Sequence, residues 1–183
     1  MTWILWIAAC SFSQPPGRTH ILKRNILDEG VLYVNKDSSC SHTPDSWDRG
    51  AEPLIVNIDC YAKKNPYYRT ALWTGSHLQV TLMSIPVGGE IGLEMHEHVD
   101  QFIRIEDGCG LVMMGKSKTL LNDRQRVNRD YAVIVPAGTW HNIINNGNAP
   151  LKLYSIYAPP QHLFGTVHKT KKAAENAECG CQE

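Results

Sequence analysis

The chain has 183 residues, 43% of them hydrophobic, and its 18 Lys and Arg side chains are balanced by 18 Asp and Glu side chains. A chain of this length can bury one sizeable core, but two domains would each have a small one. Because the formal net charge is zero, we expect neither nucleic acid nor a membrane surface as a partner.

An apolar run at residues 3–9 precedes Cys10. The run lacks the basic region of a signal peptide and is too short to span a bilayer. We therefore expect a cytoplasmic protein with reduced cysteines. The alternative is a lipoprotein anchored through Cys10. Residues 11–52 are rich in Ser, Pro, Gly, Asp and Asn, so we interpret residues 1–52 as an N-terminal extension or arm.

The composition of the sequence changes at about residue 53, where short runs rich in β-forming residues begin to alternate with Gly- and Pro-containing turns. These runs predict strands at 54–58, 70–73, 78–86, 92–96, 102–106, 110–114, 132–135, 141–145 and 151–157. The polar residues between Ser117 and Asp130 predict a loop or hairpin tip. Residues 166–183 read as a polar C-terminal tail, in which 169–178 could form a short helix. This pattern predicts an all-β antiparallel sandwich or barrel over residues 53–165.

His96 and His98 lie two residues apart in one of the predicted strands. Alternate residues of a strand share a face, so both imidazoles could point into one cavity. Imidazole is the commonest metal ligand in proteins, but an isolated His-x-His pair is weak evidence. Tyr157, His162 and His168 follow later and could line the mouth of a pocket.

Residues 88–108 and 136–145 together resemble the two motifs of the cupin superfamily. The first family motif is Gly, five residues, His-x-His, three or four residues, Glu, six residues, Gly. The second is Gly, five residues, Pro-x-Gly, two residues, His, three residues, Asn. The second motif fits at Pro136, Gly138, His141 and Asn145, with Asp130 in place of its leading Gly. The resemblance implies a double-stranded β-helix, that is, a jelly-roll barrel.

Two registers of the first motif place different residues at the site. Counting between Gly88 and Gly108 puts Glu94 and His96 at the His-x-His positions and Gln101 at the Glu position. The resemblance then implies a metal site made of Glu94, His96, Gln101 and His141. The other register uses His96 and His98 and breaks the count to Gly108. A third possibility is a metal-free barrel, in which Gln101 has ended metal binding.

The implied ligand set offers nitrogen and oxygen atoms with one negative charge, which suits one divalent ion of Zn, Mn, Fe, Co or Ni and leaves coordination positions open. The resemblance implies a metal-dependent enzyme of isomerase type that acts on a small polar, sugar-like substrate, with Glu97 or His98 as a proton-transferring base. A non-haem metal oxygenase and a non-catalytic module that binds or senses a small molecule are the alternatives. We also expect a homodimer, because small cupins commonly pair through sheet edges.

Overall fold

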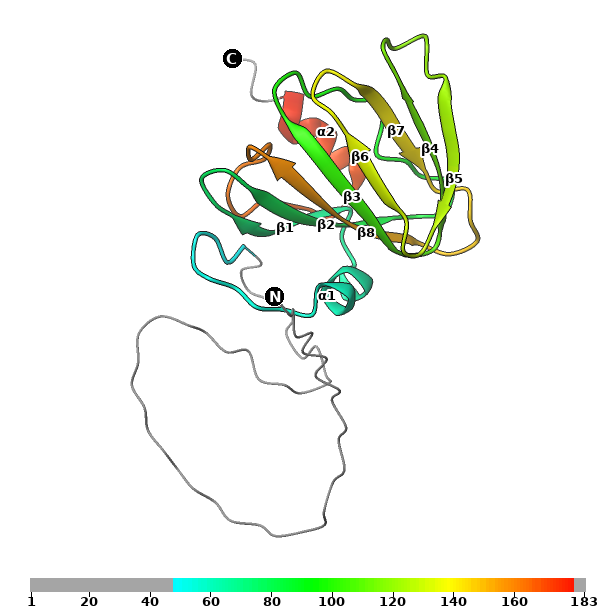
Figure 1. Cartoon of the computed structure of the whole chain (residues 1–183). Coiled ribbons are helices and arrows are strands. Elements are labelled where there is room, and N and C mark those ends of the chain that lie inside the picture. Colours follow the sequence, from blue (N-terminus) through cyan, green and yellow to red (C-terminus); the bar gives the residue numbers. More distant parts are fainter. Residues whose placement is uncertain (1–47, 180–183) are drawn as a thin grey trace, which may run out of the picture.

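The computed structural model of the chain describes residues 48–179. Its elements are α1 (Ile58–Lys64), β1 (Arg69–Thr74), β2 (Gln79–Ile85), β3 (Asp100–Asp107), β4 (Cys109–Gly115), β5 (Asp123–Asn128), β6 (Ala132–Val135), β7 (Trp140–Ile144), β8 (Leu151–Ala158), β9 (Val167–His168) and α2 (Lys171–Cys179). A six-stranded sheet in the order β6-β3-β8-β2-β1-β9 and a three-stranded sheet in the order β5-β4-β7 form the two walls of the barrel (Figure 1). The strand pairs are antiparallel, as the sequence predicted.

Seven of the predicted strands are confirmed and two are wrong. The confirmed ones correspond to β1, β2, β3, β4, β6, β7 and β8. The segment 54–58 is not a strand, because α1 begins at Ile58 and the side chain of Asn57 caps it by accepting a hydrogen bond from the backbone N of Cys60 at 3.1 Å. The segment 92–96 is not a strand either, since its only ladder contact is an isolated bridge between Glu94 and His141.

The expected loop at 117–130 contains strand β5. This strand lies at the edge of the three-stranded sheet, and five of its six side chains are exposed. Only Val127 contributes to the core. A strand with a single buried residue has no alternating hydrophobic pattern, which is why its sequence resembles a loop.

The C-terminal residues return to the barrel. Strand β9 pairs with β1, and the short helix expected at 169–178 is confirmed by α2. Ala174 of α2 is buried in the main core cluster, and the Nζ atom of Lys171 lies 2.9 Å from Oε1 of Glu90.

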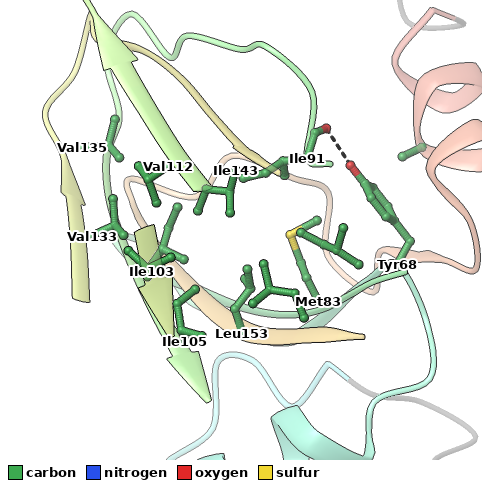
Figure 2. Packing of buried hydrophobic residues seen from close by; sticks show 14 residues of the cluster. Tyr68, Met83, Ile91, Ile103, Ile105, Val112, Val133, Val135, Ile143 and Leu153 are labelled. Atoms are coloured by element: carbon green, nitrogen blue, oxygen red, sulfur yellow. Dashed lines mark hydrogen bonds between the residues drawn. The ribbon is translucent and has the colours of Figure 1, made fainter. Parts of the chain in front are cut away.

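Two apolar clusters stabilise the barrel. The main one fills the space between the sheets, with Ile105 and Leu153 from one sheet and Val112 and Ile143 from the other (Figure 2). Tyr68 closes one end of this cluster by donating a hydrogen bond to the carbonyl of Ile91 at 2.7 Å. A smaller cluster lies between α1 and the outer face of the six-stranded sheet and is built on Ala62, Leu72 and Leu82 (Figure 1).

The inner face of the six-stranded sheet changes from apolar to polar along its strands. The ladders of β3, β8 and β2 place Ile105, Leu153 and Met83 in one row, Ile103, Ser155 and Thr81 in the next, and Gln101, Tyr157 and Gln79 in the third. All nine side chains are buried. We call the second and third rows the polar layer. Polar groups are seldom buried in such numbers without a use, so the polar layer marks the end of the barrel where chemistry is to be sought.

Two expectations concern parts of the chain that are described incompletely. The apolar run, Cys10 and most of the expected N-terminal arm lie outside the described residues.

Cys109 is a free, exposed thiol, whereas Cys60 takes part in a disulfide, so the expectation of reduced cysteines is wrong for Cys60. Within residues 48–179, neither helix has the length and apolar character that a membrane crossing requires.

Candidate metal centre

Glu94, His96 and His141 come together beside the polar layer. Each offers one ligand atom, and these atoms lie within 4.8 Å of one another. Oε1 of Glu94 is 3.4 Å from Nε2 of His96 and 3.4 Å from Nε2 of His141. Two imidazole nitrogens and one carboxylate oxygen thus converge on one point, as metal ligands do.

Backbone hydrogen bonds hold these residues in place although the segment around Glu94 is not a strand. The backbone N of Glu94 donates to the carbonyl of His141 at 3.0 Å, and the N of His141 donates to the carbonyl of Glu94 at 2.9 Å. The N of Gly138 donates to the carbonyl of His96 at 2.8 Å. The two motifs are therefore joined directly through the backbone at the site.

The imidazole of His141 is oriented by its own turn. Its Nδ1 atom lies 3.0 Å from the carbonyl oxygen of Thr139, and a carbonyl can only accept, so Nδ1 carries the hydrogen in the neutral ring. Nε2, which faces Glu94, is then the nitrogen whose lone pair a metal ion can bind. A backbone carbonyl that fixes the tautomer in this way is typical of histidines that bind metals.

The Glu94 side chain is 24% exposed, but its Oε1 atom is buried. Burial alone would raise the pKa of this carboxyl. The imidazoles of His141 and His96 and the positive charge of Arg69 outweigh burial and hold the pKa well below its usual range. Glu94 is therefore an anion at neutral pH and supplies the negative charge that a buried cation requires.

Four polar atoms at the centre have no hydrogen-bond partner among the described residues. They are Oε1 of Glu94, Nε2 of His96, Nε2 of His141 and Oε1 of Gln101. Buried polar atoms are nearly always satisfied in native proteins. Three of these atoms belong to the residues that converge, and all four are of the kinds that bind divalent metals, so they fit a metal ion.

Gln101 lies in the polar layer on β3 and is 2% exposed. Its Nε2 atom donates to Oγ of Ser155 at 2.8 Å, which leaves Oε1 as the free end of the amide. Across the β3–β8 ladder Gln101 faces Tyr157, whose ring lies 5.8 Å from that of His96. Gln101 is thus connected to the three converging residues through Tyr157.

Glu97 and His98 are not brought to this group. Their side chains are 78% and 85% exposed, and their nearest charged atoms are 4.0 Å apart. The register that starts from Gly88 therefore agrees with the grouping of side chains, and the register that uses His98 does not.

Positive backbone angles explain several motif positions. Gly88, Gly108 and Gly138 have φ of 74°, 84° and 77°, a region that favours glycine. Asp130, which stands where the family motif has Gly, has φ of 72°. Aspartate tolerates this conformation better than most residues, so the departure from the motif leaves the turn intact.

Tyr157 and His162 lie closer to the centre than the sequence indicated. The ring of Tyr157 is edge-on to that of His96, and the ring of His162 is edge-on to Tyr157 with centroids 5.1 Å apart. Burial and the charge of Arg69 lower the pKa of His162 to about 3, so this imidazole is neutral at physiological pH. The only sequence signal for either residue is its position just after the second motif.

Comparison with known proteins gives the family. Residues 81–157 match the model of the cupin domain, and the Bacillus subtilis protein YrkC is 63% identical over 131 residues, which cover 72% of this chain and 70% of YrkC. The chain belongs to the cupin superfamily. A crystal structure of BH2720 from Bacillus halodurans is 60% identical, with a TM-score of 0.70, and the match covers 70% of this cupin and 98% of that chain.

A more distant structure shows the same fold. A double-stranded β-helix protein from Klebsiella pneumoniae is 19% identical with a TM-score of 0.50, and the match covers 64% of this cupin and 98% of that chain. The jelly-roll barrel implied by the two motifs is therefore confirmed. The family and the fold leave the reaction open, because one fold carries many chemistries.

Proposed function

We propose that this cupin binds one divalent metal ion through Glu94, His96 and His141, with Gln101 as a fourth ligand, and that it is a metal-dependent enzyme of isomerase type acting on a small polar, sugar-like molecule. The observation that carries the proposal is the convergence of three unpartnered ligand atoms within 4.8 Å. Four protein ligands leave positions open on an octahedral ion, where a substrate oxygen can bind.

When bound, the metal would supply Lewis acidity, which polarises a carbonyl or hydroxyl group of the substrate. The protein's own part is to hold the donor atoms in place. Thr139 fixes the ring of His141, and Ser155 fixes the amide of Gln101. The anionic Glu94 offsets part of the cation's charge in a buried place.

The proton transfer of an isomerase was assigned from the sequence to Glu97 or His98. Because both side chains are largely exposed, we give them no part in the proposed mechanism. Buried groups beside the centre that could hold a substrate oxygen include the hydroxyl of Tyr157 and the imidazole of His162.

A non-haem metal oxygenase is the second candidate, because two histidines and one carboxylate are the ligand set of that enzyme class. The identity of the metal separates the candidates. Iron accompanied by O₂ uptake would support the oxygenase, whereas Zn²⁺ or Mn²⁺ accompanied by aldose–ketose interconversion would support the isomerase. Stoichiometric metal without either turnover would leave a binding or sensing module.

The metal site is tested by metal analysis and thermal melts of the purified protein with each of the five ions and with a chelator. A metal present at 100 times its Kd stabilises the fold by about 2.7 kcal/mol. We expect His141→Ala to abolish both the bound metal and this stabilisation. The matched control His98→Ala, at an exposed histidine, should keep both. A wild-type protein that binds none of the ions, or the reverse behaviour of the two variants, would refute the assignment.

The remaining expectations on partners are proposals as well. We propose a small-molecule substrate and a homodimer. The mass of the protein in solution, measured by light scattering across a concentration range, tests the dimer, and a monomer at all concentrations would refute it.

A further inference from the structure

A second set of buried polar atoms lies beside the proposed ligands and serves neither the fold nor the metal. It comprises the hydroxyls of Tyr157 and Thr81 and the Nε2 atom of His162, none of which has a hydrogen-bond partner within the described part of the chain. Tyr157 and Thr81 are both 0% exposed. Unsatisfied hydroxyls at this depth are costly for folding, so their retention calls for a use.

Tyr157 connects this set to the proposed metal centre. Its ring stands edge-on to the ring of His96, at 5.8 Å and 82°, and to the ring of His162, at 5.1 Å and 90°. Thr81 and Ser155 lie next to the hydroxyl of Tyr157 and belong to the neighbouring row of the polar layer. Neither side chain makes a hydrogen bond to that hydroxyl. Tyr157 thus contacts both His96 of the proposed metal centre and His162 of this second set.

The backbone of His162 is held in place by a buried side chain. Gln79 is 0% exposed, and its Oε1 accepts hydrogen bonds from the backbone N of His162 at 2.9 Å and of Gln161 at 3.3 Å. Its Nε2 donates to the carbonyl of His162 at 2.9 Å. Three hydrogen bonds from one glutamine fix the loop that brings His162 against Tyr157, which is how a binding residue is preorganised.

We propose that Tyr157, His162 and Thr81 form a subsite that binds one hydroxyl group of a small sugar-like molecule whose other oxygen atoms bind the metal. The subsite rests on the proposed metal function and names the class of molecule for it. A hydroxyl and a neutral imidazole can each donate and accept hydrogen bonds, so they match a substrate hydroxyl, which also does both.

Glycerate and lactate test the subsite because they differ by one hydroxyl, at the third carbon. We load the full chain with Co²⁺, follow its visible absorption while titrating each acid, and measure the affinity for Co²⁺ itself by competition with a chelator. Glycerate should bind more tightly than lactate. Tyr157→Phe should weaken glycerate by about two- to tenfold, the worth of one hydrogen bond, and leave the affinities for lactate and for Co²⁺ unchanged.

Two further variants, one a control and one a second test, check the role assigned to Tyr157. Tyr154→Phe removes a hydroxyl from the other face of β8 and should change neither affinity. Thr81→Val keeps the shape of the side chain and should reduce glycerate binding selectively. Both Tyr157→Phe and Thr81→Val remove an unpartnered buried hydroxyl, so both should be at least as resistant to heat as the wild type, which a purely structural role would not allow.

The subsite and the metal site fail in different ways. If no variant and no wild-type protein binds Co²⁺, the proposed function is refuted, and the same titrations are then followed on the metal-free protein by the NMR signals of its tyrosines. In the Co²⁺-loaded protein, equal binding of glycerate and lactate by the wild type would overturn the subsite. Equal loss of both acids in Tyr157→Phe, or no loss of glycerate, would overturn it too.

Discussion

Replacing Asn145 by Ala removes the last residue of the second motif, whose side chain makes three hydrogen bonds. Its Nδ2 atom donates to the carbonyls of Ile85 and Ala149, each at 2.9 Å, and its Oδ1 accepts from the backbone N of Gly147 at 3.0 Å. The bond to Ile85 is fully buried, and the other two are partly buried. With about 1 kcal/mol for each bond, we expect a loss of about 3 kcal/mol in the free energy of unfolding.

Thermal and urea unfolding measure this loss. A chain of this size loses about 2–4 °C in Tm per kcal/mol, so Asn145→Ala should melt about 6–12 °C below the wild type. Asn146→Ala is the matched control, because Asn146 is exposed, and it should melt like the wild type. The affinity for metal should be unchanged in both, since Thr139 rather than Asn145 orients His141. A stable Asn145→Ala protein that has lost its metal would refute this separation of fold from site.

Three further variants test the backbone, the charges and the ligand set. Asp130→Ala should be about 1 kcal/mol less stable than Asp130→Gly in urea unfolding, because only glycine adopts the φ of 72° without strain; equal stability would contradict this. Burial and the neighbouring Asp59 raise the pKa of Glu106 above its usual 4.5, so Glu106 costs stability progressively as the pH rises from about 4.5 to that raised value. Glu106→Gln should therefore melt above the wild type at pH 7, and its advantage should vanish below about pH 4.5; an advantage that grows in acid would show the sign to be wrong. Gln101→Glu should widen the Tm difference between metal-loaded and chelated protein, since a second carboxylate repels Glu94 when no cation is present and binds a cation when one is; an unchanged difference would place Gln101 outside the ligand set.

The strands that could be predicted from sequence are those whose residues alternate between the two faces of a buried sheet. β6 could be predicted at its observed bounds because Ala132–Val135 is a short β-branched run that ends at the Pro136 turn; in the structure Val133 and Val135 face the core while Ala132 and Ile134 face outward. β5 could not be predicted, because it has no alternating burial pattern of its own. It forms a strand because it pairs with β4. The segment 54–58 has the apolar residues of a strand, but these pack on the outside of the sheet and lead into a capped helix.

The residue spacing of the two motifs was sufficient to predict part of the candidate site. Counting from Gly88 to Gly108 selected Glu94 over His98, and the structure brings Glu94 to His96 and His141 and leaves His98 exposed. Spacing does not report how deeply a turn residue is buried, so Glu97 and His98 could not be dismissed in advance. Nor does it show that a buried glutamine in β2 holds His162 in place, because the contact joins residues that are 83 positions apart.

The division of the six-stranded sheet into apolar and polar rows has a consequence for how this barrel can change. The rows that hold the sheets together and the rows beside the metal centre lie on the same strands, and Ile103 is the only polar-layer residue that also belongs to the main core cluster. A substitution at Thr81 or Tyr157 alters what the site can recognise, while Met83 and Leu153, two and four positions away, keep the core intact. New specificities can therefore arise one residue at a time, with stability supplied by rows that never touch the ligand.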